Sequence, residues 1–483
     1  MSETTLSNSH FLAAAFGVVF VWLALKLSRM GRREGFLPPG PPTTPILGNL
    51  LEIPKHGPHH QFKKWGSEYG EVFSLKIGNS TMIVLNSIDA VRHVREKNSA
   101  FSSDRPPSHF VEIVEGLNND LVMARYSNKW RSLRRAAHEV LSPQACRMHL
   151  AIQQAEAIQL AYELLTEPKN FRDHVRRYSN SVIMSVVYGT RIPRTTTPVA
   201  VDFWEFQEKW IDLLAPTSHP PVDMIPILKK VPERFAPWKT ICKEVRAGQQ
   251  KIYTRLLDQV ERRMARGDGN GCSMEMVCAR AKEWNLDSES LLYFGAVMIA
   301  AGSDTTSVFI QSLILFLQVH PEVQRKAQQE IDSVIGLDRM PVMDDIKRLP
   351  YVQAVIYENH RLRPVAPLSV PHAATEDIQY GNYVIPKGAV IFQNTWGIFH
   401  DEERFENHDV FNPDRFLGNP ASAKIIEYVF GGGRRVCAGV HLAKNSITLN
   451  TMHLLWGFNI TMTRDKNGNK IIPDLNNYDD VRF

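Results

Sequence analysis

The chain has 483 residues, of which 43% are hydrophobic, and a formal net charge of +5 at pH 7. This composition is typical of a folded protein with a large core, and it excludes a disordered or collagen-like chain. The positive charges are spread without basic blocks, so no nucleic-acid partner is predicted. The five cysteines are an odd number without regular spacing, which argues against a disulfide framework and favours a reducing compartment.

The N-terminal segment predicts a membrane anchor. Residues 11–25 are uninterruptedly apolar, and four basic residues follow them between positions 26 and 33. Positive charge after the span predicts a cytosolic body, whereas a cleaved signal peptide carries its charge before the apolar run. A span of about 15 residues suits a thin bilayer such as the endoplasmic reticulum membrane. We expect a lumenal N-terminus at 1–10, a transmembrane anchor at 11–27 and a single-pass protein of that membrane.

The remainder predicts one domain that is mainly α with a small β region. A basic and proline-rich hinge at 28–42 should be a stiff spacer, because its prolines cannot continue a helix. Residues 43–483 show no internal repeat or long linker. Alternating patterns predict one hairpin from Glu71 to Leu85 and another from Tyr383 to Phe392. A proline-rich segment at 216–237 should separate two helical stretches.

Residues 287–320 predict a single long helix of roughly 50 Å, capped by Asp287 or Ser288 and followed by Pro321. Its first half is apolar on every face, which would also fit a second membrane span. The apolar run before Ser303 is only about 12 residues, however, so a helix through a protein core is favoured. Polar side chains in the middle of such a helix need a purpose.

Glycines surround a cysteine near the C-terminus. Residues 430–439 read Phe-Gly-Gly-Gly-Arg-Arg-Val-Cys-Ala-Gly, and an amphipathic stretch follows. Glycines allow close approach of a flat ligand, and the positive end of a helix dipole favours the thiolate form of Cys437. A thiolate binds iron, and backbone N–H groups tune that bond. A bare Gly-Gly-Gly would indicate a simple turn, but here the whole pattern Phe-x-x-Gly-x-Arg-x-Cys-x-Gly is present.

With this pattern the sequence resembles the cytochrome P450 family, and further segments match that family in its order. One is similar to the Trp-x-x-x-Arg pair that holds a haem propionate, and another to the oxygen-activation segment. Two more match the Glu-x-x-Arg motif and the arginine that completes its ion-pair triad. The matching residues are Trp130 and Arg134, Ala301 to Thr306, Glu358 and Arg361, and Arg415. The resemblance implies the cytochrome P450 fold, with a catalytic domain at 43–483.

The resemblance also implies a cofactor, haem (heme b, iron protoporphyrin IX), with Cys437 as its axial ligand. The residues expected to bind it are Trp130, Arg134, Ala301, His372, Phe430, Arg435, Cys437 and Gly439. Arg134 and Arg435 are preferred for its two carboxylates, because buried charges require partners. His372 stands where the family more often has arginine, and a neutral histidine would offer one hydrogen bond and no charge, so its role stays open.

Asp304 and Thr305 are expected to deliver protons to iron-bound oxygen, with Gly302 leaving room for dioxygen; the simpler alternative is that Thr305 bonds back to the preceding turn. Glu358, Arg361 and Arg415 are expected to form a buried triad that clamps the loop leading to Cys437. For Glu358 and Arg361, three residues apart on a helix, the alternative is a solvated surface pair.

The implied activity is hydroxylation of a hydrophobic small molecule: R–H + O₂ + NADPH + H⁺ gives R–OH + H₂O + NADP⁺. Because no Gly-x-Gly-x-x-Gly opens a βαβ unit, NADPH should act through a separate cytochrome P450 reductase, with cytochrome b5 as a further candidate partner. Substrate contacts are expected at 106–123, 216–237, 297–301 and 365–370. The Val-Pro-His sequence ending at His372 resembles fungal members of secondary metabolism. The alternatives are a haem-thiolate isomerase, dehydratase or lyase without external electrons, and a non-enzymatic membrane haem sensor.

Overall fold

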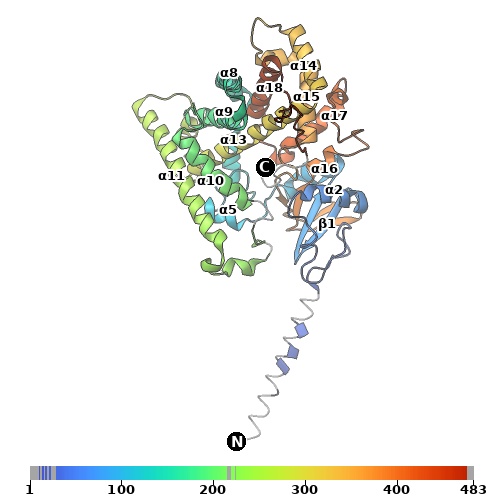
Figure 1. Ribbon diagram of the computed structural model, residues 1–483. Helices are drawn as coiled ribbons and strands as arrows, with labels where there is room; N and C mark the ends of the chain where they lie inside the picture. Colours follow the sequence, from blue (N-terminus) through green and yellow to red (C-terminus); the bar gives the residue numbers. More distant parts are fainter. Residues whose placement is uncertain are drawn as a thin grey trace.

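Helices make up most of the molecule, and two small sheets lie together on one side of it (Figure 1). The computed structural model describes residues 29–214, 219–223 and 225–475, together with residues 10, 14, 15, 17, 18, 21 and 22. The predicted anchor at 11–27 therefore lies mostly outside the described residues. The longer helices are α2 (Pro58–Tyr69), α6 (Asn128–Leu141), α8 (Leu150–Thr166), α9 (Phe171–Tyr188), α10 (Pro198–Leu214), α11 (Pro237–Arg266), α13 (Ser288–Val319), α14 (Pro321–Val334), α15 (Pro350–Leu362) and α18 (Val440–Gly457). The shorter ones are α3 (Ile88–Val91), α4 (Ser99–Ser102), α5 (His109–Val114), α7 (Pro143–Met148), α12 (Ser273–Ala279), α16 (Thr395–Phe399) and α17 (Pro420–Ile426).

Helix α13 runs through the core. The carboxylate of Asp287 caps it by accepting a hydrogen bond from the backbone N–H of Ser290 at 2.7 Å, and Pro321 opens the next helix. The helix packs against α9, α11 and α18 in the largest hydrophobic cluster. In the described part of the chain it alone is long and apolar enough to cross a membrane, but half of its apolar window is buried in the protein. The predicted core helix is thus confirmed.

Four strands from distant parts of the chain form the larger sheet. The strands are β1 (Val72–Ile77), β2 (Ser80–Leu85), β3 (His372–Ala373) and β6 (Val390–Gln393), in the order β1-β2-β6-β3. β1 and β2 are the predicted antiparallel hairpin, and β6 pairs parallel with β2. His372 lies opposite Ile391 in the antiparallel pair of β3 and β6. The sheet therefore fixes the position of His372 relative to the N-terminal strands.

The second predicted hairpin, from Tyr383 to Phe392, is wrong. Its first half forms β5 (Tyr383–Ile385), which pairs with β4 (Ile378–Tyr380), whereas its second half belongs to the larger sheet. A two-residue loop at 381–382 closes the β4–β5 hairpin, and its glycine has a positive φ of 55°. The turn at 386–388 instead carries the chain from one sheet to the other.

The proline-rich segment packs against β1 and does not stand apart as a spacer. Arg33 donates hydrogen bonds to the carbonyl groups of Gly40, Pro41 and Ser74 and to the Ser74 hydroxyl. Leu37 is only 3% exposed. A Cβ added at Gly40 would lie 2.1 Å from the Ser74 carbonyl oxygen. The chain from Arg33 onward is therefore part of the folded body.

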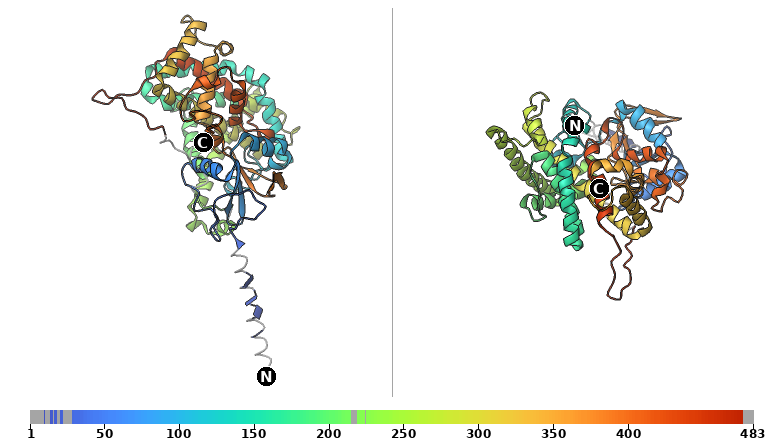
Figure 2. Two further views of the ribbon diagram at one scale, coloured as in Figure 1. Left: turned by 90° about the vertical axis from the view of Figure 1, so that its right-hand side faces the viewer. Right: turned by 90° about the horizontal axis from the view of Figure 1, so that it is seen from above.

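The chain after α18 returns along the helical part. Gln324 of α14 exchanges hydrogen bonds with the backbone of Ile460 in both directions. A turn near 465–469 then projects from the body (Figure 2). Arg363, which follows α15, donates to the carbonyl group of Leu475. This C-terminal segment forms one wall of the larger of the two cavities described below.

Candidate active site

The loop before α18 holds Cys437 at its tip. Gly433 has a φ of +63°, and a Cβ there would lie 2.2 Å from the carbonyl oxygen of Arg95, so only glycine fits against η1 (Arg92–Lys97). The backbone N–H of Cys437 donates to the Phe430 carbonyl group at 2.8 Å. The backbone N–H of Gly439 donates to the Cys437 sulfur. Together these contacts fix the direction of the thiol.

Cys437 lies among protein atoms, yet its side chain is exposed, because it faces an internal space. Burial raises the pKa of its thiol, while the Gly439 N–H and the charge of Arg134 lower that pKa. The expected contribution of the helix dipole, which favours the thiolate form, acts against this burial, and α18 begins shortly after the cysteine, at Val440. A metal cation on the sulfur would hold the thiolate form despite burial.

Ala301 and Thr305 lie one turn apart in the middle of α13, and both are exposed although most of the helix is buried. The Thr305 hydroxyl donates to the Ala301 carbonyl group at 2.8 Å, which is the simpler alternative considered above. A Cβ at Gly302 would lie 2.6 Å from Ile183 of α9. Gly302 therefore allows α9 to pack closely against α13, whereas it was expected to leave room for dioxygen. The exposed side of α13 is the one that carries Ala301 and Thr305.

Asp304 points toward α10. Its carboxylate accepts a hydrogen bond from the side-chain amide of Gln207 at 2.7 Å. Gln207 is 6% exposed and was not predicted as a site residue. A buried amide among the apolar residues of α10 is the signal that could have marked it. A hydrogen bond thus joins Asp304, one of the two predicted proton-delivery residues, to α10.

Trp130, Arg134 and Arg435 come together beside the cysteine loop. The Arg435 guanidinium lies 4.0 Å from the Trp130 ring centroid and donates to three backbone carbonyl groups. The Trp130 indole N–H donates to the carbonyl group of Leu121 at 3.0 Å. Arg134 makes no hydrogen bond to any residue that the structure describes; burial lowers its pKa, and the neighbouring Cys437 acts in the opposite direction.

Two further buried arginines, Arg95 and Arg105, belong to the same cluster, and no sequence motif predicted either of them. Each is 4% exposed, and burial lowers the pKa of Arg95 to about 10. Burial, then the charges of Arg435 and Arg95, lower the pKa of Arg105 further. Within the described ranges, no carboxylate oxygen lies within 4.0 Å of the guanidinium groups of Arg95, Arg105, Arg134 and Arg435. Buried cations without counter-ions are costly, so an anion is expected here.

His372 is buried in β3 next to this cluster. Its Nδ1 lies 2.6 Å from the Ser102 carbonyl oxygen, and its Nε2 lies 2.5 Å from a guanidinium nitrogen of Arg95. Burial, followed by the charges of Arg95 and Arg105, holds the pKa of His372 well below its usual value. The histidine is therefore neutral at pH 7, and it adds no charge to the cluster.

Glu358, Arg361 and Arg415 form a buried ion-pair triad. Glu358 bonds Arg361 through both carboxylate oxygens, at 2.7 and 2.9 Å, and the side chains of both are fully buried. Arg415 adds a contact to Glu358 at 3.2 Å. The alternative of a solvated pair is excluded. The arginines donate to carbonyl groups between Phe399 and Val410, so the triad holds that segment and reaches the cysteine loop only through the chain that follows.

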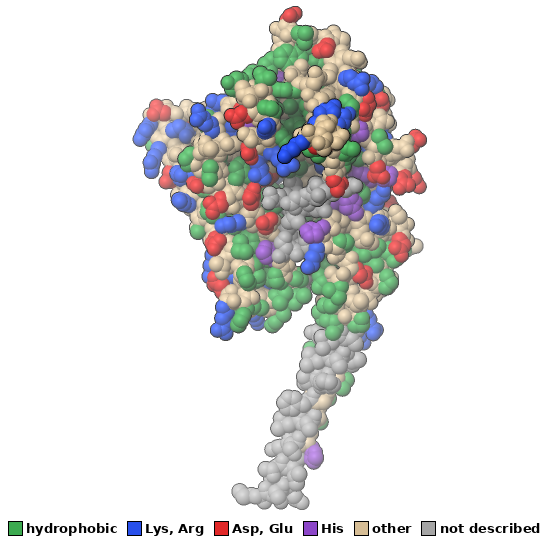
Figure 3. Space-filling view, viewed as in Figure 1, with side chains coloured by type: hydrophobic (Ala, Val, Ile, Leu, Met, Phe, Trp, Pro, Cys, Tyr) green, Lys and Arg blue, Asp and Glu red, His purple; other side chains and the backbone are tan. Residues whose placement is uncertain are grey.

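A cavity of about 1430 Å³ lies beside the second half of α13, and Figure 3 shows this face of the molecule hollowed, with basic side chains next to the hollow. Of the predicted substrate contacts, only the 365–370 segment lines it. The rest of the wall comes from α13, the 164–176 region, α10 and the C-terminal segment, and the last three of these were not predicted. Lining residues include Trp204, Ile211, Asp304, Gln311, Val365, Pro367, Trp396, Phe458 and Ile460.

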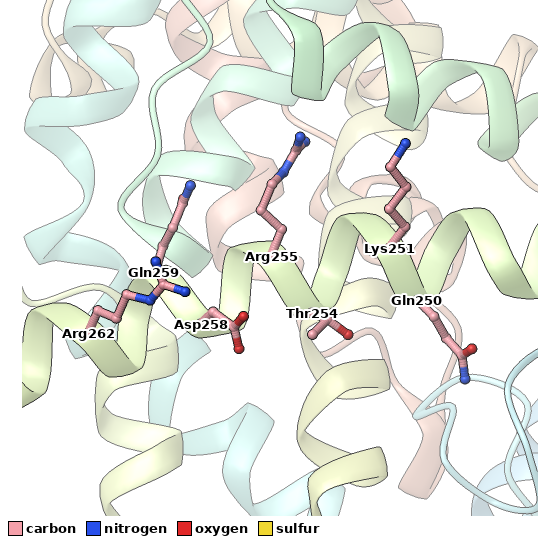
Figure 4. Close-up of a pocket in the computed structure, with 7 residues that line it drawn as sticks. All are labelled: Gln250, Lys251, Thr254, Arg255, Asp258, Gln259 and Arg262. Carbon is pink, nitrogen blue, oxygen red and sulfur yellow. The ribbon is translucent and has the colours of Figure 1, made fainter.

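A second, smaller groove of about 530 Å³ lies on α11 alone (Figure 4). Its seven lining residues run along one helix face from Gln250 to Arg262, and most are exposed. One of them, Arg255, pairs with Asp202 of α10 at 3.5 Å. None of the predicted site residues lines this groove, and it has no role in the site.

Comparison with known proteins agrees with this fold. The family model described as Cytochrome P450 matches residues 38–475. A cytochrome P450 monooxygenase of Armillaria gallica is 45% identical over 97% of this chain and 90% of its own length. One of Aspergillus terreus is 36% identical over 92% of this chain and 86% of its own, and one of Penicillium expansum is 36% identical over 95% and 89%. The fold and the cysteine loop are those of a haem-thiolate oxidoreductase. The chain belongs to the cytochrome P450 family and is a monooxygenase.

Membership in this family implies a haem with an axial thiolate. The described residues fit such a group in three respects. An accessible cysteine faces an internal space, four arginines lack a carboxylate partner, and α13 has an open side in its middle. A flat, dianionic iron complex would satisfy all three requirements.

Proposed function

We propose that the chain hydroxylates a hydrophobic small molecule with dioxygen, using electrons from NADPH that a separate reductase delivers. The observation that carries this proposal is the accessible Cys437 thiol beside three buried arginines and the half-buried Arg134, none of which has a carboxylate oxygen within 4.0 Å among the described residues. In this proposal the Cys437 sulfur would bind the iron, and Arg105, Arg134 and Arg435 would bind the cofactor carboxylates. When bound, the haem supplies dioxygen activation and oxygen-atom transfer.

The protein's own contribution on the open side of α13 is the supply of protons. Thr305 is exposed on this side with its hydroxyl bonded to the Ala301 carbonyl group, and Asp304 lies one residue away, held by Gln207. Asp304 also lines the large cavity, so it connects that cavity to the threonine. We propose that protons pass from the cavity through Asp304 to Thr305, while α10 limits the entry of water.

The large cavity is the proposed substrate site. Its aromatic and aliphatic walls, from α10, α13 and the C-terminal segment, favour a hydrophobic molecule, and the polar side chains among them would orient it. The fungal origin of the relatives supports a small secondary metabolite as substrate. The apolar run near the N-terminus and the basic residues after it support a single-pass anchor in the endoplasmic reticulum membrane, with the body in the cytosol.

A steady-state assay with cytochrome P450 reductase, NADPH and a panel of hydrophobic metabolites tests the proposal. We expect oxygen consumption that depends on substrate and on NADPH, and we expect one hydroxylated product for each dioxygen consumed. Candidate substrates should first be selected by their displacement of water from the iron, measured as a spectral shift. Turnover without NADPH would indicate an isomerase or lyase instead, and binding without turnover would indicate a sensor.

A further inference from the structure

The hydrogen-bonding capacity of His372 is already used. A neutral imidazole has one donor and one acceptor nitrogen. The Ser102 carbonyl group can only accept, so His372 Nδ1 carries the proton, and the Arg95 guanidinium can only donate, so Nε2 is the acceptor. No donor of His372 remains for an anionic ligand.

Arg95 has donors to spare. It donates to Ser369 at 3.3 Å, to Gln393 at 2.6 Å and to His372 at 2.5 Å, which uses three of the five N–H groups of a guanidinium. Its Nε is buried and has no partner among the residues that the structure describes. A buried, unpaired N–H on a cation indicates a missing acceptor.

Arg95 lies between the cysteine loop and the other arginines of the cluster. Its backbone carbonyl group contacts the cysteine loop at Gly433, and its guanidinium lies 3.7 Å from the point where a Cβ at Gly431 would stand. The charges of Arg95 and Arg435 both lower the pKa of Arg105, so Arg105 lies close to both. Arg95 therefore lies within the arginine cluster, on the side of β3.

We propose that Arg95, and not His372, supplies the positive charge that binds a haem carboxylate beside β3. His372 is then a positioning residue: it accepts one hydrogen bond from Arg95 and fixes the direction of the remaining N–H groups. The inference rests on the proposed haem site. It explains how the cluster keeps a cation at this corner although position 372 holds a neutral histidine.

The test moves the charge from position 95 to position 372 in the full chain loaded with haem. The variants are R95M, R95K, H372R and the double variant R95M/H372R, with R92M as a matched control, because Arg92 lies on the same short helix with 42% of its side chain exposed. Transfer of haem to excess apomyoglobin measures the rate of haem loss, and spectroelectrochemistry measures the reduction potential. Neither readout depends on turnover.

We expect R95M to lose haem about tenfold faster than the wild type, as predicted for the loss of one charge-assisted hydrogen bond. Its reduction potential should fall, because a positive charge near the iron stabilises the reduced state. R95K should lie between R95M and the wild type. The double variant should regain most of the haem affinity and potential, H372R alone should not slow haem loss, and R92M should match the wild type.

Haem loss from R95M at the wild-type rate would overturn the inference, and so would faster loss from the double variant than from R95M. Circular dichroism checks the folding of each variant. If R95M does not fold, the double variant still decides, because a guanidinium at position 372 restores haem binding only if charge is what Arg95 supplies. A wild-type protein that takes up no haem, or binds it through nitrogen, would instead refute the proposed function.

Discussion

Cys437 is exposed, whereas Cys272, which also has an N–H donor and an arginine beside its sulfur, is buried. Burial raises the pKa of Cys146, Cys242 and Cys278 to about 11 or 12, and no arginine charge offsets it there. The Cys437 sulfur has both an N–H donor and the charge of Arg134 beside it. We expect Cys437→Ser to abolish the red-shifted Soret band of the reduced carbon monoxide complex, whereas Cys278→Ser should keep it. An unchanged spectrum for Cys437→Ser would contradict the ligand assignment.

Thr305 is one hydroxyl on the open side of α13, and its removal should affect proton supply but not folding. Its only hydrogen bond in the described part of the chain returns to the Ala301 carbonyl group, which the helix already satisfies. We expect Thr305→Ala to bind haem normally and to lower product per NADPH by about tenfold or more, with peroxide formed instead, since a positioned proton donor contributes on the order of 10² to 10⁴ in rate. Thr305→Ser keeps the hydroxyl and should stay coupled. Equal coupling in the Ala variant would refute the role.

At the scale of elements, the triad that joins α15 to Arg415 should contribute more to stability than any exposed pair. Glu358 is fully buried between two guanidinium groups, and Glu358→Gln would leave them without a counter-ion. Breaking a buried ion pair costs about 3–5 kcal/mol, so we expect a clearly lower unfolding temperature and faster loss of haem. Glu283→Gln, in the exposed pair with Arg280, is the matched control and should unfold like the wild type. Equal unfolding temperatures would show that the triad is not structural.

Local patterns predicted the elements whose cause is local. The core helix α13, the β1–β2 hairpin and the proline-rich break before α11 follow from caps, alternation and prolines. The second hairpin was placed wrongly, because the turn at 386–388 has the residues of a hairpin turn but connects two sheets, and only long-range pairing decides that. The site residues show the same dependence on local and long-range causes. Motif residues were found, whereas Arg95, Arg105 and Gln207 act through burial and through partners more than 90 residues away in sequence, which no local pattern contains.

At the scale of the whole molecule, the folded body begins before the proline-rich stretch, so the prolines do not mark the boundary between the proposed anchor and the body. Arg33 holds the proline-rich segment on β1 through four hydrogen bonds, and Leu37 is buried, so the folded body begins before Pro38. We expect a variant that lacks residues 1–28 to leave the membrane fraction and to keep its haem spectrum and unfolding temperature.

A variant that lacks residues 1–37 should also leave the membrane, but it should unfold at a lower temperature, because it loses the buried Leu37 and the bonds of Arg33. Arg33→Met in the full chain separates the two effects, since it should destabilise the body without releasing it from the membrane. Fractionation of microsomes and thermal unfolding of the purified proteins measure both properties. Membrane retention after loss of residues 1–28 would place the membrane contact on the body itself, and equal stability of the two truncated proteins would show that the segment around Arg33 is a spacer after all.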